Sequence, residues 1–186
     1  VEGIDIPNPN HFAISGTSGG PVSLLNNKIL GNSDFFMSAF PAEYGNSLSG
    51  VFDLKLRNGN NNRHEFTGQF GLLGTEFLAE GPLGKNSKSS YLVMGRYSTL
   101  TIFQKLNINL GTDAIPKYFD GAFKFNWILK NGGQLSFFGM GGNSDIAIEI
   151  SGFKEYTEDL YGEGDRDQYF GTSMITSGLN YKKSIN

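Results

Sequence analysis

Alternation of apolar and polar residues is the dominant pattern in the chain, and it begins near residue 64. Every second residue from Phe66 to Leu72 is apolar or glycine, which is the period of a β-strand. From Leu73 to Ala79 the alternation continues, but its phase is shifted by one residue. Such a shift indicates a bulge or a tight hairpin. The sequence therefore predicts a hairpin near Leu73–Thr75.

Four further stretches show the same alternation. We predict strands at 89–99, 119–130, 134–142 and 170–184. The second of these is the clearest. One of its faces carries Phe119, Gly121, Phe123, Phe125, Trp127 and Leu129, and the other carries Asp120, Ala122, Lys124, Asn126, Ile128 and Lys130. The pattern predicts one apolar, aromatic face and one polar face.

The first sixty residues have a different texture, with short apolar pieces broken by Gly, Asn and Ser. Two strands are predicted there, Val1–Ile6 and Val51–Leu56. The run NGNNN at 58–62 is a turn or linker, because Asn and Gly favour turn conformations. We place the domain boundary at this run, which divides the chain into residues 1–60 and 61–186.

The connections between the predicted strands alternate in length. Those near residues 86 and 131 are short, whereas those at 100–117 and 144–168 are long. Short turns on one rim and long loops on the other are typical of an outer-membrane β-barrel. A soluble β-sandwich, with the aromatic face as its core, is the alternative.

Composition narrows the possible classes of protein further. Glycine accounts for 26 of 186 residues, aromatic residues for 13% and charged residues for only 18%, which favours strands and turns over a helical bundle. The net charge of −3 argues against a nucleic-acid partner. The absence of Cys excludes disulfide frameworks and thiol catalysis. The chain begins and ends in strand-like sequence, so we expect it to be part of a longer protein.

Three stretches carry a family resemblance. Residues 41–59, PAEYGNSLSGVFDLKLRNG, contain Tyr44–Gly45 and Gly50 ahead of a hydrophobic strand. Residues 79–100 read as two strands around a short turn, and residues 1–9 are VEGIDIPNP. In this order the stretches resemble the plug domain and first barrel strands of TonB-dependent outer-membrane receptors, in which Asp is commoner at the position of Glu2.

The resemblance implies a mainly β fold: the C-terminal part of a plug domain, followed by about six antiparallel strands of a transmembrane β-barrel of about 22 strands. It implies import of a scarce nutrient across the outer membrane of a Gram-negative cell, with no enzymatic chemistry and no cofactor. The implied partners are outer-membrane lipid, the TonB energising complex (through a segment absent from these residues), and a small-molecule, glycan, peptide or metal-chelate cargo. A lid lipoprotein is a further partner by family analogy. A passive or export barrel is the other alternative, and the plug motif argues against it.

The resemblance also gives particular residues a role. Gly45 and Gly50 would allow tight backbone packing where the plug enters its last strand. Asp120, Lys124 and Asn126 would face inward and meet the plug, where they need hydrogen-bond partners.

Ligand contacts are expected in two regions. Asn8, Asn10, His11 and Phe12 follow a plug strand that the family directs outward, although Asn side chains also hold ordinary turns. In the acidic stretch 155–169, Tyr156 and Tyr161 are candidate contacts, because Tyr is enriched at recognition surfaces.

Metal and catalytic signals are weak. Glu163, Asp165 and Asp167 are a weak calcium candidate, since their spacing does not match an EF-hand loop and a solvated loop is the simpler interpretation. The string GTSGGP at 16–21 is similar to a serine-protease nucleophile loop, with Ser18 as nucleophile. However, His11 is too close in sequence, so we predict no enzyme.

Overall fold

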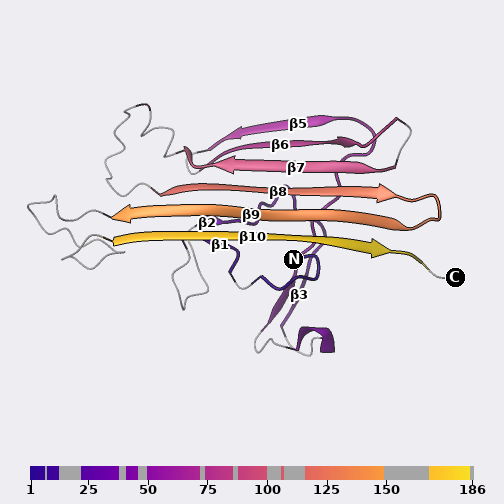
Figure 1. Ribbon diagram of the computed structural model, residues 1–186, viewed down its shortest axis with the longest axis horizontal. Helices are drawn as coiled ribbons and strands as arrows, with labels where there is room; N and C mark the ends of the chain where they lie inside the picture. Colours follow the sequence, from indigo (N-terminus) through magenta and orange to yellow (C-terminus); the bar gives the residue numbers. More distant parts are fainter. Residues whose placement is uncertain are drawn as a thin grey trace, which may run out of the picture.

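The computed structural model contains one large antiparallel sheet and a smaller N-terminal part beside it (Figure 1). It describes residues 1–6, 8–12, 22–37, 41–45, 50–71, 74–85, 88–99, 106, 116–148 and 168–184. The statements below concern these residues.

Six strands form the large sheet in simple sequential order. They are β5 (Glu65–Phe70), β6 (Thr75–Pro82), β7 (Ser90–Tyr97), β8 (Lys117–Ile128), β9 (Gln134–Ile148) and β10 (Gln168–Lys182). Each strand pairs antiparallel with the next one along the chain. The predicted hairpin is confirmed, because β5 and β6 pair from Phe70↔Thr75 outward.

The predicted strand limits need one clear correction. The sequence places residues 144–148 in a polar connection, but β9 continues to Ile148 and pairs there with Gln168 of β10. Ser144 and Asp145 are polar, and yet they continue the ladder because β8 and β10 offer backbone partners on both sides. Pairing across strands therefore overrides local composition here.

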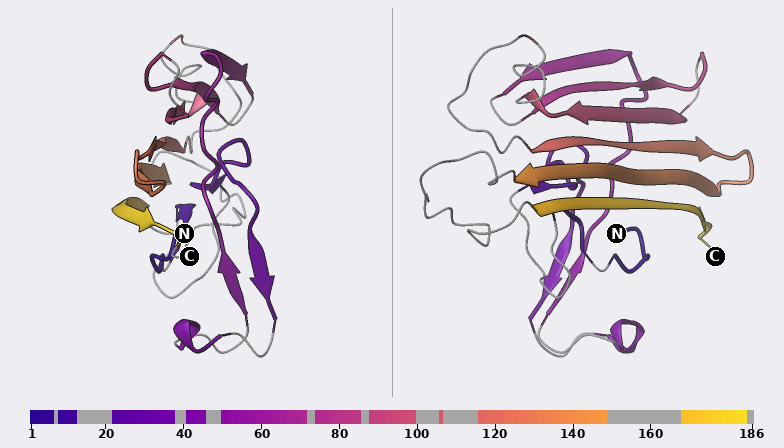
Figure 2. Two further views of the ribbon diagram at one scale, coloured as in Figure 1. Left: turned by 90° about the vertical axis from the view of Figure 1, so that its right-hand side faces the viewer. Right: turned by 60° about the vertical axis from the view of Figure 1, so that its left-hand side comes forward.

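The described residues of the N-terminal segment, 1–57, form short strands. β1 (Asn10–His11) pairs with β2 (Val22–Ser23), and β3 (Asp34–Phe36) pairs with β4 (Val51–Asp53). A 3₁₀ turn, η1 (Ala42–Tyr44), precedes β4. The β3–β4 ribbon extends away from the large sheet (Figure 2).

Two strands predicted in this segment are changed. The predicted strand Val1–Ile6 is wrong: Glu2 and Gly3 both have positive φ, 52° and 85°, which turns the backbone instead of extending it. The predicted strand Val51–Leu56 is confirmed over Val51–Asp53, and Leu56 forms only an isolated bridge with Leu30.

The two faces of the large sheet differ as the alternation predicts. We call the face with Asp120 and Lys124 the polar face, and the face with Phe123 and Trp127 the aromatic face. The N-terminal segment lies against the polar face, so this charged face is the buried one (Figure 2). Its apolar residues Leu24, Ile29 and Leu56 form the core with side chains from the sheet, namely Leu78, Leu92, Met94, Ala122, Phe138 and Met140.

The aromatic face retains large exposed side chains. Phe77 and Phe119 are each 56% exposed, and Ile175 is 88% exposed. Phe123, Phe125 and Trp127 are half-buried, and the ring contacts they make are with one another and with Phe137 on the same face. A soluble sandwich would require the aromatic face to be the core. In the described part of the chain, the core instead lies on the polar face.

Candidate functional site

Charged side chains at the interface between the N-terminal segment and the polar face form the most distinctive chemical feature of the fold. Glu76 and Glu80 on β6, and Asp120 and Lys124 on β8, are each less than 10% exposed. Their even numbers place them on the same face of their strands. A buried charge is costly unless it is paired, so the partners of these groups decide whether the interface is stable.

Lys124 is paired with the start of the chain. Its Nζ donates to Glu2 Oε1 over 2.7 Å and to the Leu56 carbonyl over 2.6 Å. Glu2 Oε1 also accepts from the Leu56 backbone N–H over 2.8 Å. The turn at Glu2–Gly3 brings this carboxylate under the sheet. The expectation that Lys124 meets the N-terminal region through hydrogen bonds is confirmed.

Arg57 and Glu80 form a bidentate pair. Nη1 and Nη2 of Arg57 each donate to one carboxylate oxygen over 2.7 Å, and the Asn60 backbone N–H donates to Oε2 over 2.8 Å. Two parallel charge-assisted bonds make this one of the stronger polar contacts a protein forms. The bonds to Glu80 raise the pKa of the Arg57 guanidinium.

A neighbouring carboxylate on β6 is held in the same way. Glu76 accepts from Asn26 Nδ2 over 2.6 Å and forms an ion pair with Lys28. Lys28 also donates to Gln69 on β5. Both partners of Glu76 come from the short segment after β2, which is thereby fixed on β5 and β6.

Asp120 is the centre of a third cluster. Its Oδ2 accepts from Arg96 Nε over 2.9 Å and from Arg96 Nη2 over 2.8 Å, and it lies 2.8 Å from His11 Nε2. An ionised carboxylate only accepts, so His11 Nε2 is the donor. Arg96 also donates to the Ser23 carbonyl. The cluster thus joins both strands of the β1–β2 hairpin to β7 and β8.

A glycine makes room for this cluster. A Cβ on Gly142 would lie 2.4 Å from Leu24 Cδ2, 2.8 Å from His11 Cε1 and 2.9 Å from Asp120 Cβ. Any side chain at this position of β9 would push the β1–β2 hairpin away from the sheet. Close approach of the hairpin therefore depends on Gly142.

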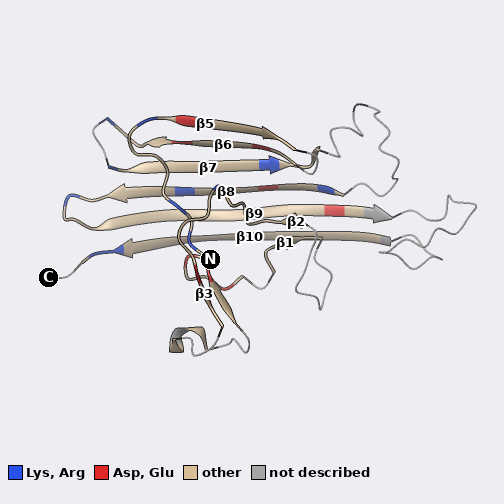
Figure 3. Cartoon of the chain, turned by 180° about the vertical axis from the view of Figure 1, so that it is seen from behind, with Lys and Arg blue, Asp and Glu red and all other residues tan. Residues whose placement is uncertain are grey.

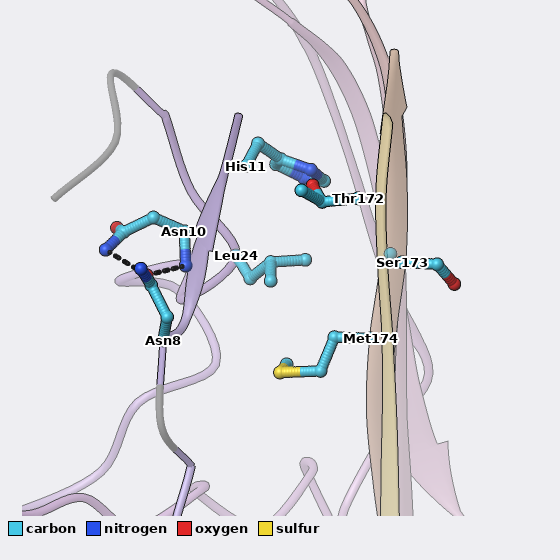
Figure 4. Close-up of a pocket in the computed structure, with 8 residues that line it drawn as sticks. Asn8, Asn10, His11, Leu24, Thr172, Ser173 and Met174 are labelled. Atoms are coloured by element: carbon cyan, nitrogen blue, oxygen red, sulfur yellow. Dashed lines mark hydrogen bonds between the residues drawn. The ribbon is translucent and has the colours of Figure 1, made fainter. Parts of the chain in front are cut away.

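Three of the four predicted N-terminal ligand residues line one cavity. Asn8, Asn10 and His11 border a space of about 210 Å³, together with Leu24, Thr172 and Met174 (Figure 4). Asn8 Oδ1 accepts from the backbone N–H of Asn10 over 3.2 Å and from its Nδ2 over 2.9 Å, so an Asn side chain also holds the turn. Ligand contact by Asn8 and Asn10 stays a prediction.

His11 and Phe12 are occupied with the protein itself. His11 is 1% exposed and contacts Asp120. Phe12 has a positive φ of 58°, donates its backbone N–H to Ser144 Oγ over 3.1 Å, and lies edge-on to Tyr118 with ring centroids 6.1 Å apart. Both residues anchor β1 on the polar face.

The two glycines of the plug motif behave differently. A Cβ on Gly50 would lie 3.2 Å from both Phe35 Cε2 and the Phe36 carbonyl, so the tight packing predicted there is confirmed. For Gly45, which has φ −64°, a Cβ would lie 3.7 Å from Ala42 O within the described residues, which is an ordinary contact distance, so tight packing there stays a prediction. Tyr44 in η1 packs on Phe36, with ring centroids 5.7 Å apart.

Several predicted site residues lie outside the described residues. These are Ser18, Tyr156, Tyr161, Glu163, Asp165 and Asp167. Among the residues with a described position, no group of three or more His, Asp or Glu side chains could hold a metal ion. Within the same residues, no helix has the length and apolar character needed to cross a membrane.

The sequence points to Asp120 and Lys124, but not to most of the other charged residues of this interface. Glu2 was noted only as a motif position, and Lys28, Arg57, Glu76, Glu80 and Arg96 were not identified. A signal was present for three of them, because Glu76, Glu80 and Arg96 are charges within otherwise apolar strands. Asn126, predicted to meet the N-terminal region, instead accepts from Gln134 and Ser136 on β9.

Comparison with protein-family profiles, with curated proteins and with solved structures gives no match.

Proposed function

We propose that this chain is part of a TonB-dependent outer-membrane transporter. In this proposal the N-terminal segment belongs to the plug, and β5 to β10 belong to the wall of a transmembrane β-barrel. The observation that carries the proposal is the inverted distribution of the faces: the charged face is buried against the N-terminal segment, and the aromatic face carries the exposed apolar side chains. A sheet between a polar plug and lipid has this distribution.

The aromatic face supports contact with lipid along its length. Following the register across the six strands, its charged positions are Lys117 and Asp145, which pair with each other at the end that carries the long connections. Tyr91, Trp127 and Tyr181 lie toward the opposite end, and Tyr97 and Tyr169 lie toward the end with the long connections. Amphipathic rings favour the headgroup level of a bilayer, so two such groups are expected on a membrane-spanning wall.

The distance between the ends of this apolar band agrees with a membrane. Phe119 and Trp127 on β8 are eight residues apart. At about 3.4 Å per residue and a strand tilt of about 40°, they are separated by about 21 Å along the membrane normal. Outer-membrane barrels have an apolar band about 25 Å tall.

The interface with the N-terminal segment supports a plug that moves. Three contacts that fix the segment on the sheet are ion pairs, Lys124–Glu2, Arg57–Glu80 and Lys28–Glu76, and a fourth is the hydrogen bond between His11 and Asp120. Water can replace the partners of charged groups when the surfaces separate, whereas exposed apolar surface has no such compensation. Polar attachment therefore lowers the cost of displacing the segment.

The proposed mechanism assigns no chemistry to the cargo. Cargo binds above the N-terminal segment, and force from the energising complex separates the segment from the polar face. Lys124, Arg96 and the carboxylates of β6 then face water instead of their partners. When the force ends, the same groups pair again and return the segment to the sheet.

The proposal is tested by locating the full-length protein. An antibody against this chain should detect a band several times larger than 20.3 kDa in the outer-membrane fraction, and the band should shift on heating, as folded β-barrels do. A known cytoplasmic protein serves as the fractionation control. A soluble band near 20 kDa that does not shift would overturn the proposal and favour a small β-sandwich binding module.

Transport then separates a plugged importer from a passive or export barrel. Uptake that stops when the energising complex is inactivated supports the proposal. Unchanged uptake in a strain without that complex would leave a barrel but remove the TonB-dependent function.

A further inference from the structure

Exposed lysines gather at the end of the large sheet that has the short turns (Figure 3). Lys85 and Lys88 lie in the β6–β7 turn, Lys130 lies in the β8–β9 turn, and Lys182 and Lys183 lie at the end of β10. None of these five forms an ion pair within the described part of the chain. Arg63 at the same end is paired with Glu65, Nε to Oε1, over 2.6 Å. This end, which we call the basic rim, therefore has a surplus of positive charge.

A cleft opens on the basic rim beside the β6–β7 turn. Its volume is about 820 Å³, and its lining includes Asn61, Asn62, His64, Pro82, Lys85 and Lys88. No acidic side chain is among the described residues that line it. Two lysines, two asparagines and a histidine thus line one space, and their donor groups are complementary to an anionic oxygen-rich group.

The cleft is continuous with the aromatic face. His64 Nδ1 lies 3.0 Å from the Tyr91 hydroxyl, and their ring centroids are 5.8 Å apart. Gly81, opposite Tyr91 in the register, makes this possible, because a Cβ there would lie 2.1 Å from His64 Nδ1. Tyrosines at the edge of an apolar band sit at the headgroup level. The cleft therefore lies at the depth of lipid phosphates if the aromatic face contacts lipid.

We propose that this cleft binds the phosphodiester headgroup of an anionic phospholipid in the leaflet next to the short turns. Lys85 and Lys88 contact the phosphate, His64 and Asn62 donate to its remaining oxygens, and the acyl chains run along the aromatic face past Tyr91. The inference rests on the proposed function, because it requires the aromatic face to be in a membrane. Charge complementarity and continuity with the apolar band select a lipid over a free anion.

The test uses the full-length protein, folded in micelles, with native mass spectrometry as the readout. Phosphatidylglycerol and phosphatidylethanolamine are added at equal concentration to the wild type and to Lys85→Gln/Lys88→Gln. A basic side chain near an anionic headgroup is worth about fivefold in affinity, so the double variant should bind phosphatidylglycerol at least about tenfold less. Phosphatidylethanolamine binding should be nearly unchanged.

A matched control removes the same charge elsewhere. Lys55→Gln/Lys117→Gln neutralises one lysine of the N-terminal segment and one at the opposite end of β8, and it should retain phosphatidylglycerol. The heat shift of each variant reports whether the barrel has folded. Equal loss in both double variants would show a general charge effect and would overturn the headgroup site.

Three further outcomes separate this inference from the proposed function. A heat-shifting barrel without preference for phosphatidylglycerol overturns the headgroup site and leaves the transporter proposal standing. Complete competition by millimolar inorganic phosphate assigns the cleft to a free anion and also overturns the lipid site. A protein that never enters a membrane and shows no heat shift removes both.

Discussion

A lysine placed on the aromatic face should measure how deeply each position lies in the membrane. Phe123 is midway between Phe119 and Trp127 on β8, and its ring packs on Gly139, where a Cβ would lie 2.7 Å from it. Four residues of tilted strand place Phe123 about 10 Å from either end of the band, whereas Phe125 is only about 5 Å from Trp127. Phe123 therefore lies nearer the bilayer midplane.

The expected costs follow from these depths. Lysine on the lipid face of a barrel costs about 2–4 kcal/mol at the midplane and about 0–1 kcal/mol near the interface. Phe123→Lys should therefore destabilise the folded barrel by about 3 kcal/mol beyond Phe123→Ala, which controls for the lost ring. Phe125→Lys should cost about half as much relative to Phe125→Ala.

The assay is urea-dependent folding of the full-length protein into phospholipid vesicles, with the heat-shifted band as the folded fraction. Two results would refute the reasoning. One is a lysine that costs no more than alanine at position 123. The other is a greater lysine penalty at 125 than at 123. A soluble sandwich would instead fold without vesicles and show no dependence on depth.

Three other perturbations probe the interface between the N-terminal segment and the polar face. Lys124→Met leaves the buried Glu2 carboxylate without its ammonium partner and should destabilise the fold by about 3–5 kcal/mol in urea unfolding. The double variant Glu2→Gln/Lys124→Met should recover much of that loss. Equal losses of stability in the single and double variants would contradict the pairing. Gly142→Ala should cost about 1–3 kcal/mol, because its Cβ meets Leu24, His11 and Asp120, whereas Gly45→Ala should be nearly neutral. Cysteines at positions 2 and 124, joined by a short bis-maleimide, should block uptake but leave cargo binding intact, and normal uptake by the linked protein would show that this part of the segment need not leave the sheet.

The strands and their faces are largely a property of the sequence. Side chains alternate with a period of two along any strand, so the run from Phe119 to Leu129 predicts an aromatic face and a charged face without knowledge of neighbouring strands. The phase shift at Leu73 predicts the β5–β6 hairpin for the same reason. These inferences need only local information.

The ends of the irregular elements are harder to predict from the sequence. Val1–Ile6 has the composition of a strand, but Glu2 and Gly3 have positive φ. The backbone N–H of Glu2 bonds to the Leu54 carbonyl, whereas that of Ile4 bonds back to Val1, so no ladder forms in the described residues. Residues 144–148 have the composition of a connection, but β8 pairs with β9 as far as Asp145 and β10 pairs with it as far as Ile148. In both places the available backbone partners decided the conformation, and a partner distant in sequence leaves no local pattern.

The tertiary structure alone decided which charges meet. The sequence by itself determined that Asp120 and Lys124 share the polar face of one strand, and that this face would be covered followed only from the family resemblance. It could not determine that the partners are His11 and Arg96 for one, and Glu2 and the Leu56 carbonyl for the other, across separations of up to 122 residues. Alternation is imposed by the backbone of each strand, whereas ion pairing depends on how a segment without periodicity docks on the finished sheet.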